Sequence, residues 1–264
     1  MRIMLTNDDG IQAEGLVTLE AIAKTLSDDV WVVAPETEKS AASRALTISE
    51  PLRVRKVSEK RFAISGTPTD CAMLGIEELM KEHRPDLVLS GVNRGHNCAE
   101  DVSMSGTVAG AIQAMALGVP AIALSQSLAM YHDDAVAHWE SGEHYGPGII
   151  ARLLEAGWPK DVIININFPN RPIDAIDCVE VTRQGFRDVH NMRTERRTDL
   201  RGRDYYWMGF TARRPQVAEG TDIAAILDGK ISVTPLHIDL THDATVHNLK
   251  GVLGGAPPRL KAKP

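Results

Sequence analysis

Short apolar runs that alternate with helical segments are the feature that most restricts how this chain can fold. Between the first two runs, apolar residues from position 16 to 26 recur at three- and four-residue spacing, which is typical of a helix with one buried face. Strands that alternate with helices in this way indicate a parallel sheet with helices on both faces, and therefore an α/β fold. The expected strands are residues 3–6, 30–34, 62–64, 87–89, 119–124 and 162–166.

Two more helices are expected in the same part of the chain. Thr69 is predicted to cap a helix that continues to Met80, and Pro85 ends this region. Residues 108–117 are rich in Ala and Gly and predict the other helix. Sheets of this kind bind ligands at the carboxyl ends of their strands, so polar residues that directly follow a strand are the first candidates for a site.

The pattern changes after Cys178. Residues 179–182, 205–210 and 231–240 are expected to be strands, but no long helix separates them, and residues 191–203 are polar and rich in Arg. Such strands need cover from elsewhere, so we expect an antiparallel extension that associates with a second copy, in a homodimer or homotetramer. The chain is thus predicted to form one domain, 1–250, with a β-rich oligomerisation extension at about 178–241 and a flexible tail at 251–264.

Charge and cysteine content disfavour several classes of protein. The net charge of −6 argues against binding to a nucleic-acid polymer, which normally requires a basic surface. Cys71, Cys98 and Cys178 are too widely spaced for a CxxC metal site, and their odd number is unlike a disulfide framework. The N-terminal apolar run is too short for a signal peptide and no run is long enough to span a membrane, so we expect a cytoplasmic protein that does not bind membranes.

The first polar cluster, Asn7-Asp8-Asp9-Gly10, directly follows the first expected strand. Adjacent carboxylates repel each other, so both stay ionised only if a cation or hydrogen-bond donors compensate. Carboxylate oxygens suit a hard ion such as Mg²⁺ or Mn²⁺. The same residue types also favour turns, and this cluster alone leaves the turn and the metal site equally open.

The second and third polar clusters follow the next strands. Residues 36–43 contain Ser40, whose hydroxyl can bind a hard cation, although such a segment by itself is more typical of a polar loop. Residues 90–97 contain Asn93 and Asn97, whose amides can serve as oxygen ligands or as donors, together with glycines that let a ligand approach the backbone.

The Ala-rich helix opens with Ser105-Gly106-Thr107. Free amides at a helix N-terminus bind anions, and the two hydroxyls could add hydrogen bonds to a phosphate. Ser and Thr are also ordinary N-caps, so neither residue is specific by itself. The combination is more specific than any one of these features. Three strand ends supply two acids, a Ser and an Asn, and an anion site lies next to them.

Taken in order, these motifs resemble the SurE family of nucleotidases, over most of residues 1–125 and 220–241. The matching motifs are NDDG at 7–10, a Ser after VVAP at 32–35, GTPTDC at 66–71, SGVNRGxN at 90–97, SGTVxGA at 105–111 and TDIAAILDGKISVTPLHIDLT at 221–241.

The resemblance implies a Rossmann-like, three-layer α/β domain whose C-terminal extension is exchanged between subunits. It also implies hydrolysis of nucleoside 5′- and 3′-monophosphates, which some members extend to short polyphosphate, with one divalent ion per subunit, Mg²⁺ or Mn²⁺. The implied metal ligands are Asp8, Asp9, Ser40 and Asn93, of which Asp8 and Asp9 are also catalytic. The positions that match the phosphate side are Asn97, Ser105, Gly106 and Thr107.

The chain departs from the family pattern at three positions. His96 stands where Pro is common, Cys98 follows Asn97, and Glu36 replaces the usual Asp. A His beside a site invites assignment as a general acid, but a loop position is more typical of a solvated side chain. We therefore leave His96 out of the catalytic set and the leaving-group acid unassigned.

Other functions remain open at this point. A metal-dependent glycosyltransferase also uses paired acids, and a non-catalytic regulator would bind a nucleotide without turnover. A dinucleotide oxidoreductase is disfavoured because no GxGxxG follows the first strand, and an aspartyl-phosphate route is disfavoured because DxDxT is absent. The Arg-rich residues at 193–203 could contact a neighbouring subunit or polyphosphate, or form a solvated loop with their neighbouring acids.

Overall fold

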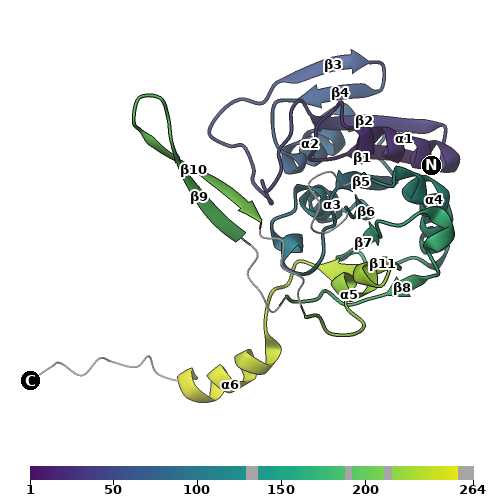
Figure 1. Cartoon of the computed structure of the whole chain (residues 1–264). Coiled ribbons are helices and arrows are strands. Elements are labelled where there is room, and N and C mark those ends of the chain that lie inside the picture. Colours follow the sequence, from purple (N-terminus) through teal and green to yellow (C-terminus); the bar gives the residue numbers. More distant parts are fainter. Residues whose placement is uncertain (129–135, 188–191, 211–215, 255–264) are drawn as a thin grey trace, which may run out of the picture.

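A nine-stranded sheet runs through the protein, and the computed structural model describes residues 1–128, 136–187, 192–210 and 216–254 (Figure 1). The order of the strands in this sheet is β3-β4-β2-β1-β5-β6-β7-β11-β8. The strands are β1 (Arg2–Thr6), β2 (Asp29–Pro35), β3 (Val54–Ser58), β4 (Arg61–Ile64), β5 (Leu87–Arg94), β6 (Ala121–Gln126), β7 (Val162–Phe168), β8 (Val179–Val181) and β11 (Ile231–His237). The six strands from β4 to β7 are parallel, whereas β3 and β11 pair antiparallel with β4 and β7. The predicted α/β class with a mostly parallel sheet is therefore confirmed.

Two apolar cores lie on the two faces of this sheet. Helices α1 (Glu14–Leu26) and α4 (Trp139–Ala156) supply Leu16, Leu19 and Ile150 to one core. Helices α2 (Pro68–Leu74) and α3 (Gly106–Ala116) supply Cys71, Val108 and Ala111 to the other. The result is the three-layer arrangement that the alternating sequence pattern predicts.

The cap of α2 differs from the prediction. Thr67, not Thr69, is the N-cap: its hydroxyl accepts from the amide of Asp70, and the Asp70 carboxylate accepts from the amide of Thr67. Pro68 follows at the first helical position, where its missing N–H costs nothing. Thr69 is buried inside the helix, and the segment expected to continue to Met80 changes to a π-helix, η1 (Gly75–Leu79).

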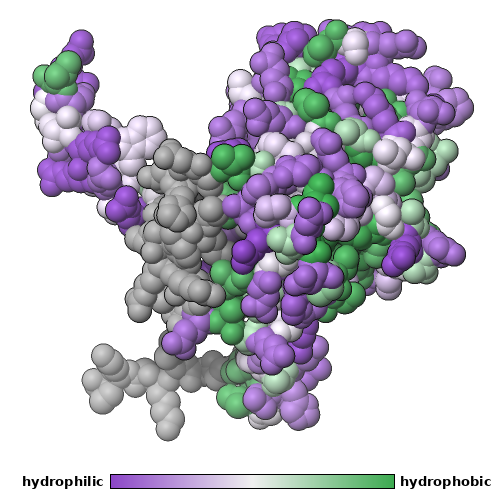
Figure 2. Space-filling view, turned by 45° about the vertical axis from the view of Figure 1, so that its right-hand side comes forward, coloured by the Kyte–Doolittle hydropathy of each residue, from purple (hydrophilic) through white to green (hydrophobic). Residues whose placement is uncertain are grey.

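The C-terminal third contains a separate hairpin and two helices. Strands β9 (Met192–Thr198) and β10 (Asp204–Phe210) form a two-stranded antiparallel sheet that projects from the body (Figures 1 and 2). The short helix α5 (Asp222–Leu227) packs near β11. Helix α6 (Asp243–Leu253) has no buried residue and points away from the sheet (Figure 1). The predicted antiparallel extension is confirmed as this hairpin.

The structure differs in three details from what the sequence suggested for this third. Much of the Arg-rich segment is strand β9 rather than a loop, and its exposed arginines pair locally, as Arg196 does with Asp204 and Arg197 with Glu195. The strand expected at 231–240 ends at His237. Residues 251–253, expected in a flexible tail, belong to α6, and residues 255–264 lie outside the described residues.

Candidate active site

The three predicted polar clusters lie at the carboxyl ends of three neighbouring strands. Residues 7–10 follow β1, residues 36–43 follow β2, and residues 93–97 lie at the end of β5, while β1 is paired with β2 on one side and β5 on the other. Segments up to 90 residues apart in the sequence are thereby brought to one edge of the sheet.

Asp8 is buried at this edge, with a relative exposure of 4%. Its Oδ1 accepts a hydrogen bond of 2.5 Å from the Thr107 hydroxyl in the first turn of α3. Gly106 lies against the same side chain, since a Cβ there would be 2.7 Å from the Asp8 Cβ. Burial, together with the charge of Asp9, raises the pKa of Asp8 to about 7, against the lowering effect of the Thr107 hydrogen bond.

Asp9 links the first cluster to the third. Its Oδ2 accepts from the backbone amide of Arg94 at 3.0 Å, which places it beside Asn93. Burial raises the pKa of Asp9, the Arg94 amide opposes this rise, and the Glu38 carboxylate adds to it. The Asn93 amide nitrogen donates to the Gly95 carbonyl at 2.8 Å, so its oxygen is the atom with ligand chemistry.

The loop after β2 is tied to the other clusters through its backbone. The Lys39 amide donates to the Asp8 carbonyl at 2.7 Å, which brings Ser40 to the same edge. Ser40 is exposed, and its hydroxyl donates to Glu38 at 2.7 Å rather than contacting either aspartate of the first cluster. Ser43, at φ +50°, donates from its amide to the Met104 carbonyl and from its hydroxyl to the Ser103 carbonyl.

The residues predicted on the phosphate side are present at the N-terminus of α3 and beside it. The Ser105 hydroxyl accepts from the Val108 amide at 3.0 Å and is therefore engaged as the N-cap. The Thr107 hydroxyl is engaged by Asp8. Charge complementarity to an anion consequently comes from the backbone amides of the first helical turn, including Gly106, rather than from these two hydroxyls.

Asn97 is held by a buried polar network. Its amide nitrogen donates to the Ser125 hydroxyl at 2.8 Å. The backbone carbonyl of Asn97 accepts hydrogen bonds from the side chains of Asn165 and Asn167. The backbone amide of Asn97 donates to the side-chain oxygen of Asn167. Asn165 and Asn167 were not among the predicted site residues, although two Asn residues in the otherwise apolar run VIININF are an unusual feature of a buried strand.

His96 contradicts the expectation of a solvated side chain. Only 18% of its side chain is exposed, and its ring nitrogens lie 3.4 Å from the Ser127 hydroxyl and 3.2 Å from the Arg187 guanidinium. Burial lowers the pKa of His96 to about 4, although Asp101 opposes this shift. Its position is set by contacts with other segments, those of Ser127 and Arg187, and the histidine is mainly neutral near neutral pH.

The oxygen ligands that the strand ends provide fit a hard divalent ion. Two adjacent carboxylates with raised pKa values lie beside the amide of Asn93 and the loop of Ser40. Among the described residues, Thr6 Oγ1, Asn7 Oδ1 and Ser90 Oγ are buried at this edge without a hydrogen-bond partner. No group of three or more His, Cys, Asp or Glu within the described ranges is arranged to hold a metal, so an ion here would depend on neutral oxygens as well as carboxylates.

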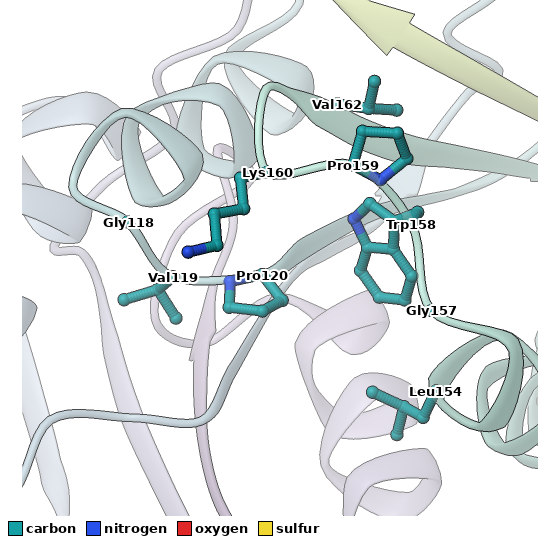
Figure 3. A pocket seen from close by; sticks show the side chains of 9 residues that line it. All are labelled: Gly118, Val119, Pro120, Leu154, Gly157, Trp158, Pro159, Lys160 and Val162. Carbon is teal, nitrogen blue, oxygen red and sulfur yellow. The ribbon is translucent and has the colours of Figure 1, made fainter.

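An apolar cavity of about 220 Å³ lies elsewhere (Figure 3). Its walls include Val119 and Pro120, which precede β6, and Trp158 and Lys160, which precede β7. The cavity is therefore at the amino ends of these strands, whereas the acidic cluster is at the carboxyl ends. It does not belong to the candidate active site.

The family profile described as Survival protein SurE matches residues 3–191 of this chain. The chain belongs to the SurE family. It is 66% identical over 259 residues to a protein of Caulobacter vibrioides (strain NA1000 / CB15N) named 5′-nucleotidase SurE, covering 98% of each chain. It is 52% identical over 250 residues to a protein of the same name from Hyphomonas neptunium (strain ATCC 15444), covering 95% of this chain and 98% of the relative.

The SurE fold is also shared with a solved structure. The crystal structure of the SurE protein from Aquifex aeolicus superposes with a TM-score of 0.79 at 36% sequence identity, covering 96% of this chain and 99% of that one. The resemblance inferred from the motifs is thus confirmed. In the described part of this SurE-family chain, no helix has both the length and the apolar composition needed to cross a membrane.

Proposed function

We propose that this chain is a divalent-metal-dependent 5′-nucleotidase, which hydrolyses nucleoside 5′-monophosphates to nucleoside and phosphate. The 5′-nucleotidase class is supported by the names of relatives that align over nearly the whole chain. The observation that carries the proposal is a pair of adjacent, largely buried carboxylates, Asp8 and Asp9, at the N-terminus of α3. Carboxylates with raised pKa values next to an anion-binding helix end suit a cation, which would neutralise negative charge on the carboxylates and on the phosphate.

Each part of the site has a separate task in this proposal. Asp8, Asp9, Ser40 and Asn93 would hold one Mg²⁺ or Mn²⁺ per subunit. When bound, the ion would supply positive charge for the phosphate and make water more acidic. The backbone amides of the first turn of α3, including that of Gly106, would donate hydrogen bonds to the phosphate at the helix end. The buried network around Asn97 would keep that side of the site rigid.

The first test is metal dependence. Treatment with a chelator is expected to abolish phosphate release from a nucleoside 5′-monophosphate, because Asp8 and Asp9 alone would present negative charge to an anionic substrate. Added Mg²⁺ or Mn²⁺ is expected to restore it, as measured by released phosphate. Full turnover in a thoroughly demetallated sample would show that the ion has no part in the reaction.

A wider substrate screen separates the alternatives. The 3′-monophosphates and short polyphosphate belong to the proposed activity, and a sugar nucleotide tests the glycosyltransferase alternative. A regulator would bind the nucleotide without releasing phosphate from it. Phosphate release from nucleoside monophosphates, with or without release from short polyphosphate, and no hydrolysis of the sugar nucleotide is the outcome that matches the proposal. We also propose that the protein is cytoplasmic.

The second prediction is that the chain forms a homodimer or homotetramer. Strand β10 exposes Tyr206, Trp207 and Met208, and α6 exposes Val252 and Leu253, all without cover in the subunit. A two-stranded sheet and a helix with no buried face are poorly stable alone, so we propose that a second copy covers them, by exchange of the extension. Light scattering should give a mass of two or four chains. A monomer at every concentration tested would contradict this.

A further inference from the structure

The segment from Asn97 to Thr107 has proposed phosphate-side residues at both ends, and its middle is a 3₁₀ helix, η2 (Ala99–Ser103). Ala99 has φ +54°, a left-handed conformation that costs energy for a residue with a Cβ. Its amide donates to Asp222 at 2.9 Å and its carbonyl accepts from Gln184 at 2.9 Å. Two residues of the C-terminal third thus hold the strained residue in place.

Arg187 holds the same helix through its side chain. The guanidinium donates to the Glu100 carboxylate at 2.8 Å and to the Asp101 carboxylate at 2.6 Å, and it reaches the Cys98 carbonyl at 3.5 Å. The Arg187 backbone amide adds a hydrogen bond of 2.5 Å to Glu100. The side chain is only 10% exposed, so these charge-assisted hydrogen bonds are largely shielded from water.

The anchored helix lies between the parts of the site. Asn97, at its start, is fixed to β6 and β7, and Met104, at its end, accepts from Ser43 of the loop that carries Ser40. The position of η2 therefore influences where the first turn of α3 presents its amides. The two acids that Arg187 binds would repel each other if its charge were removed.

We propose that Arg187 is a positioning residue that holds the segment from Asn97 to Thr107 in the geometry that binds the substrate phosphate. This rests on the proposed nucleotidase function. Arg187 acts through Glu100 and Asp101 and not on the reacting atoms. The C-terminal third thereby completes a site whose proposed ligands and phosphate-side residues all lie in the first 107 positions.

The test compares Arg187→Met and Arg187→Lys with wild type. Inorganic phosphate binding to the Mg²⁺-loaded protein is measured by calorimetry, and KM and kcat are measured with a nucleoside 5′-monophosphate. We expect Arg187→Met to weaken phosphate binding and raise KM about tenfold, with kcat and Mg²⁺ affinity within about twofold of wild type. Arg187→Lys should recover part of the loss, since it keeps the charge but not the fork of donors.

Arg84→Met is the matched control. Arg84 also binds a carboxylate and a backbone carbonyl, those of Glu77 and Leu117, but it precedes β5 and lies at the amino end of the strands. The Arg84→Met variant should therefore keep the wild-type KM and phosphate affinity. In a double-mutant cycle, Asp101→Asn should add little to Arg187→Met, because both remove the same contact.

Two results would overturn the role of Arg187. One is wild-type phosphate affinity and KM in Arg187→Met. The other is a loss of Mg²⁺ affinity in that variant as large as its loss of phosphate affinity, which would reduce Arg187 to fold maintenance. If wild type binds phosphate but releases none from a monophosphate, the nucleotidase proposal fails, and the binding comparison alone then decides the role of Arg187.

Discussion

Asp9→Asn is expected to lower kcat for a nucleoside 5′-monophosphate by about a hundredfold or more, because it removes a negative charge next to the proposed ion. The substitution preserves the size of the side chain and one oxygen. Asn can still accept the hydrogen bond from the Arg94 amide, so the local backbone should be retained. Metal titration by calorimetry, together with steady-state kinetics, should show weaker metal binding alongside the loss of turnover.

In the metal-free protein, the same substitution should be favourable, because it should raise the thermal stability. The folded-state pKa of Asp8 is about 7, above the ordinary value of 3.8, and that of Asp9 is also raised. The folded state therefore holds more protons than the unfolded state, and stability falls as pH rises from about 4 through 7. Asp9→Asn removes one of the charges, so the chelator-treated variant should unfold at a higher temperature than wild type at about pH 8, with a smaller difference near pH 4.

An Asp9→Asn variant with wild-type turnover and metal affinity would show that the acidic pair is only a turn. Asn93→Ala provides a second comparison. It removes a neutral oxygen ligand without changing charge, so we expect a loss of metal affinity in the same direction. Its metal-free stability should lack the pH-dependent gain, because it leaves both carboxylates in place.

Gly106→Ala is expected to lower kcat/KM by about a hundredfold, because the added Cβ would displace the Asp8 side chain. The new atom would lie 2.7 Å from the Asp8 Cβ and 2.9 Å from its Oδ2, closer than non-bonded atoms approach. The hydrogen bond from Thr107 would be lost or lengthened. Unfolding by denaturant should show a loss of about 1–3 kcal/mol, where Gly→Ala in a helix is ordinarily stabilising.

Gly148→Ala is the control for this prediction. Gly148 lies within α4, and a Cβ there would meet nothing within 4 Å. This variant should keep full activity and gain up to about 1 kcal/mol of stability from helix propensity. If Gly106→Ala were as active as Gly148→Ala, the tight packing of α3 against Asp8 would have no bearing on catalysis.

The strands and polar clusters could be predicted from the sequence because both are local patterns. Each candidate segment follows an apolar run, and parallel strands place their carboxyl ends at one edge. Contacts between distant segments could not be predicted in this way. The Thr107–Asp8 hydrogen bond and the Arg187 contacts depend on how α3 and the C-terminal third pack, which no spacing along the chain reveals.

The sequence did not predict β3, α4, β9, α5 or α6, and α4 and β9 illustrate two different reasons. Helix α4 contains Gly142, Gly146, Pro147 and Gly148, which weaken any helical pattern. Its packing explains part of this, because a Cβ at Gly146 would lie 3.2 Å from Ile22 of α1. Strand β9 has the polar sequence MRTERRT, with no alternation between a buried and an exposed face, so only its pairing with β10 identifies it.

The strand order makes the order of synthesis important for this chain. Of the strands in the described residues, β11 is the last to be made, yet it lies inside the sheet, paired with β7 on one side and β8 on the other. On the ribosome, a nascent chain that ends before Ile231 leaves β7 with an open hydrogen-bonding edge, flanked by Ile163, Ile164 and Ile166. Until β11 joins the sheet, the growing protein therefore keeps an open strand edge that can pair wrongly.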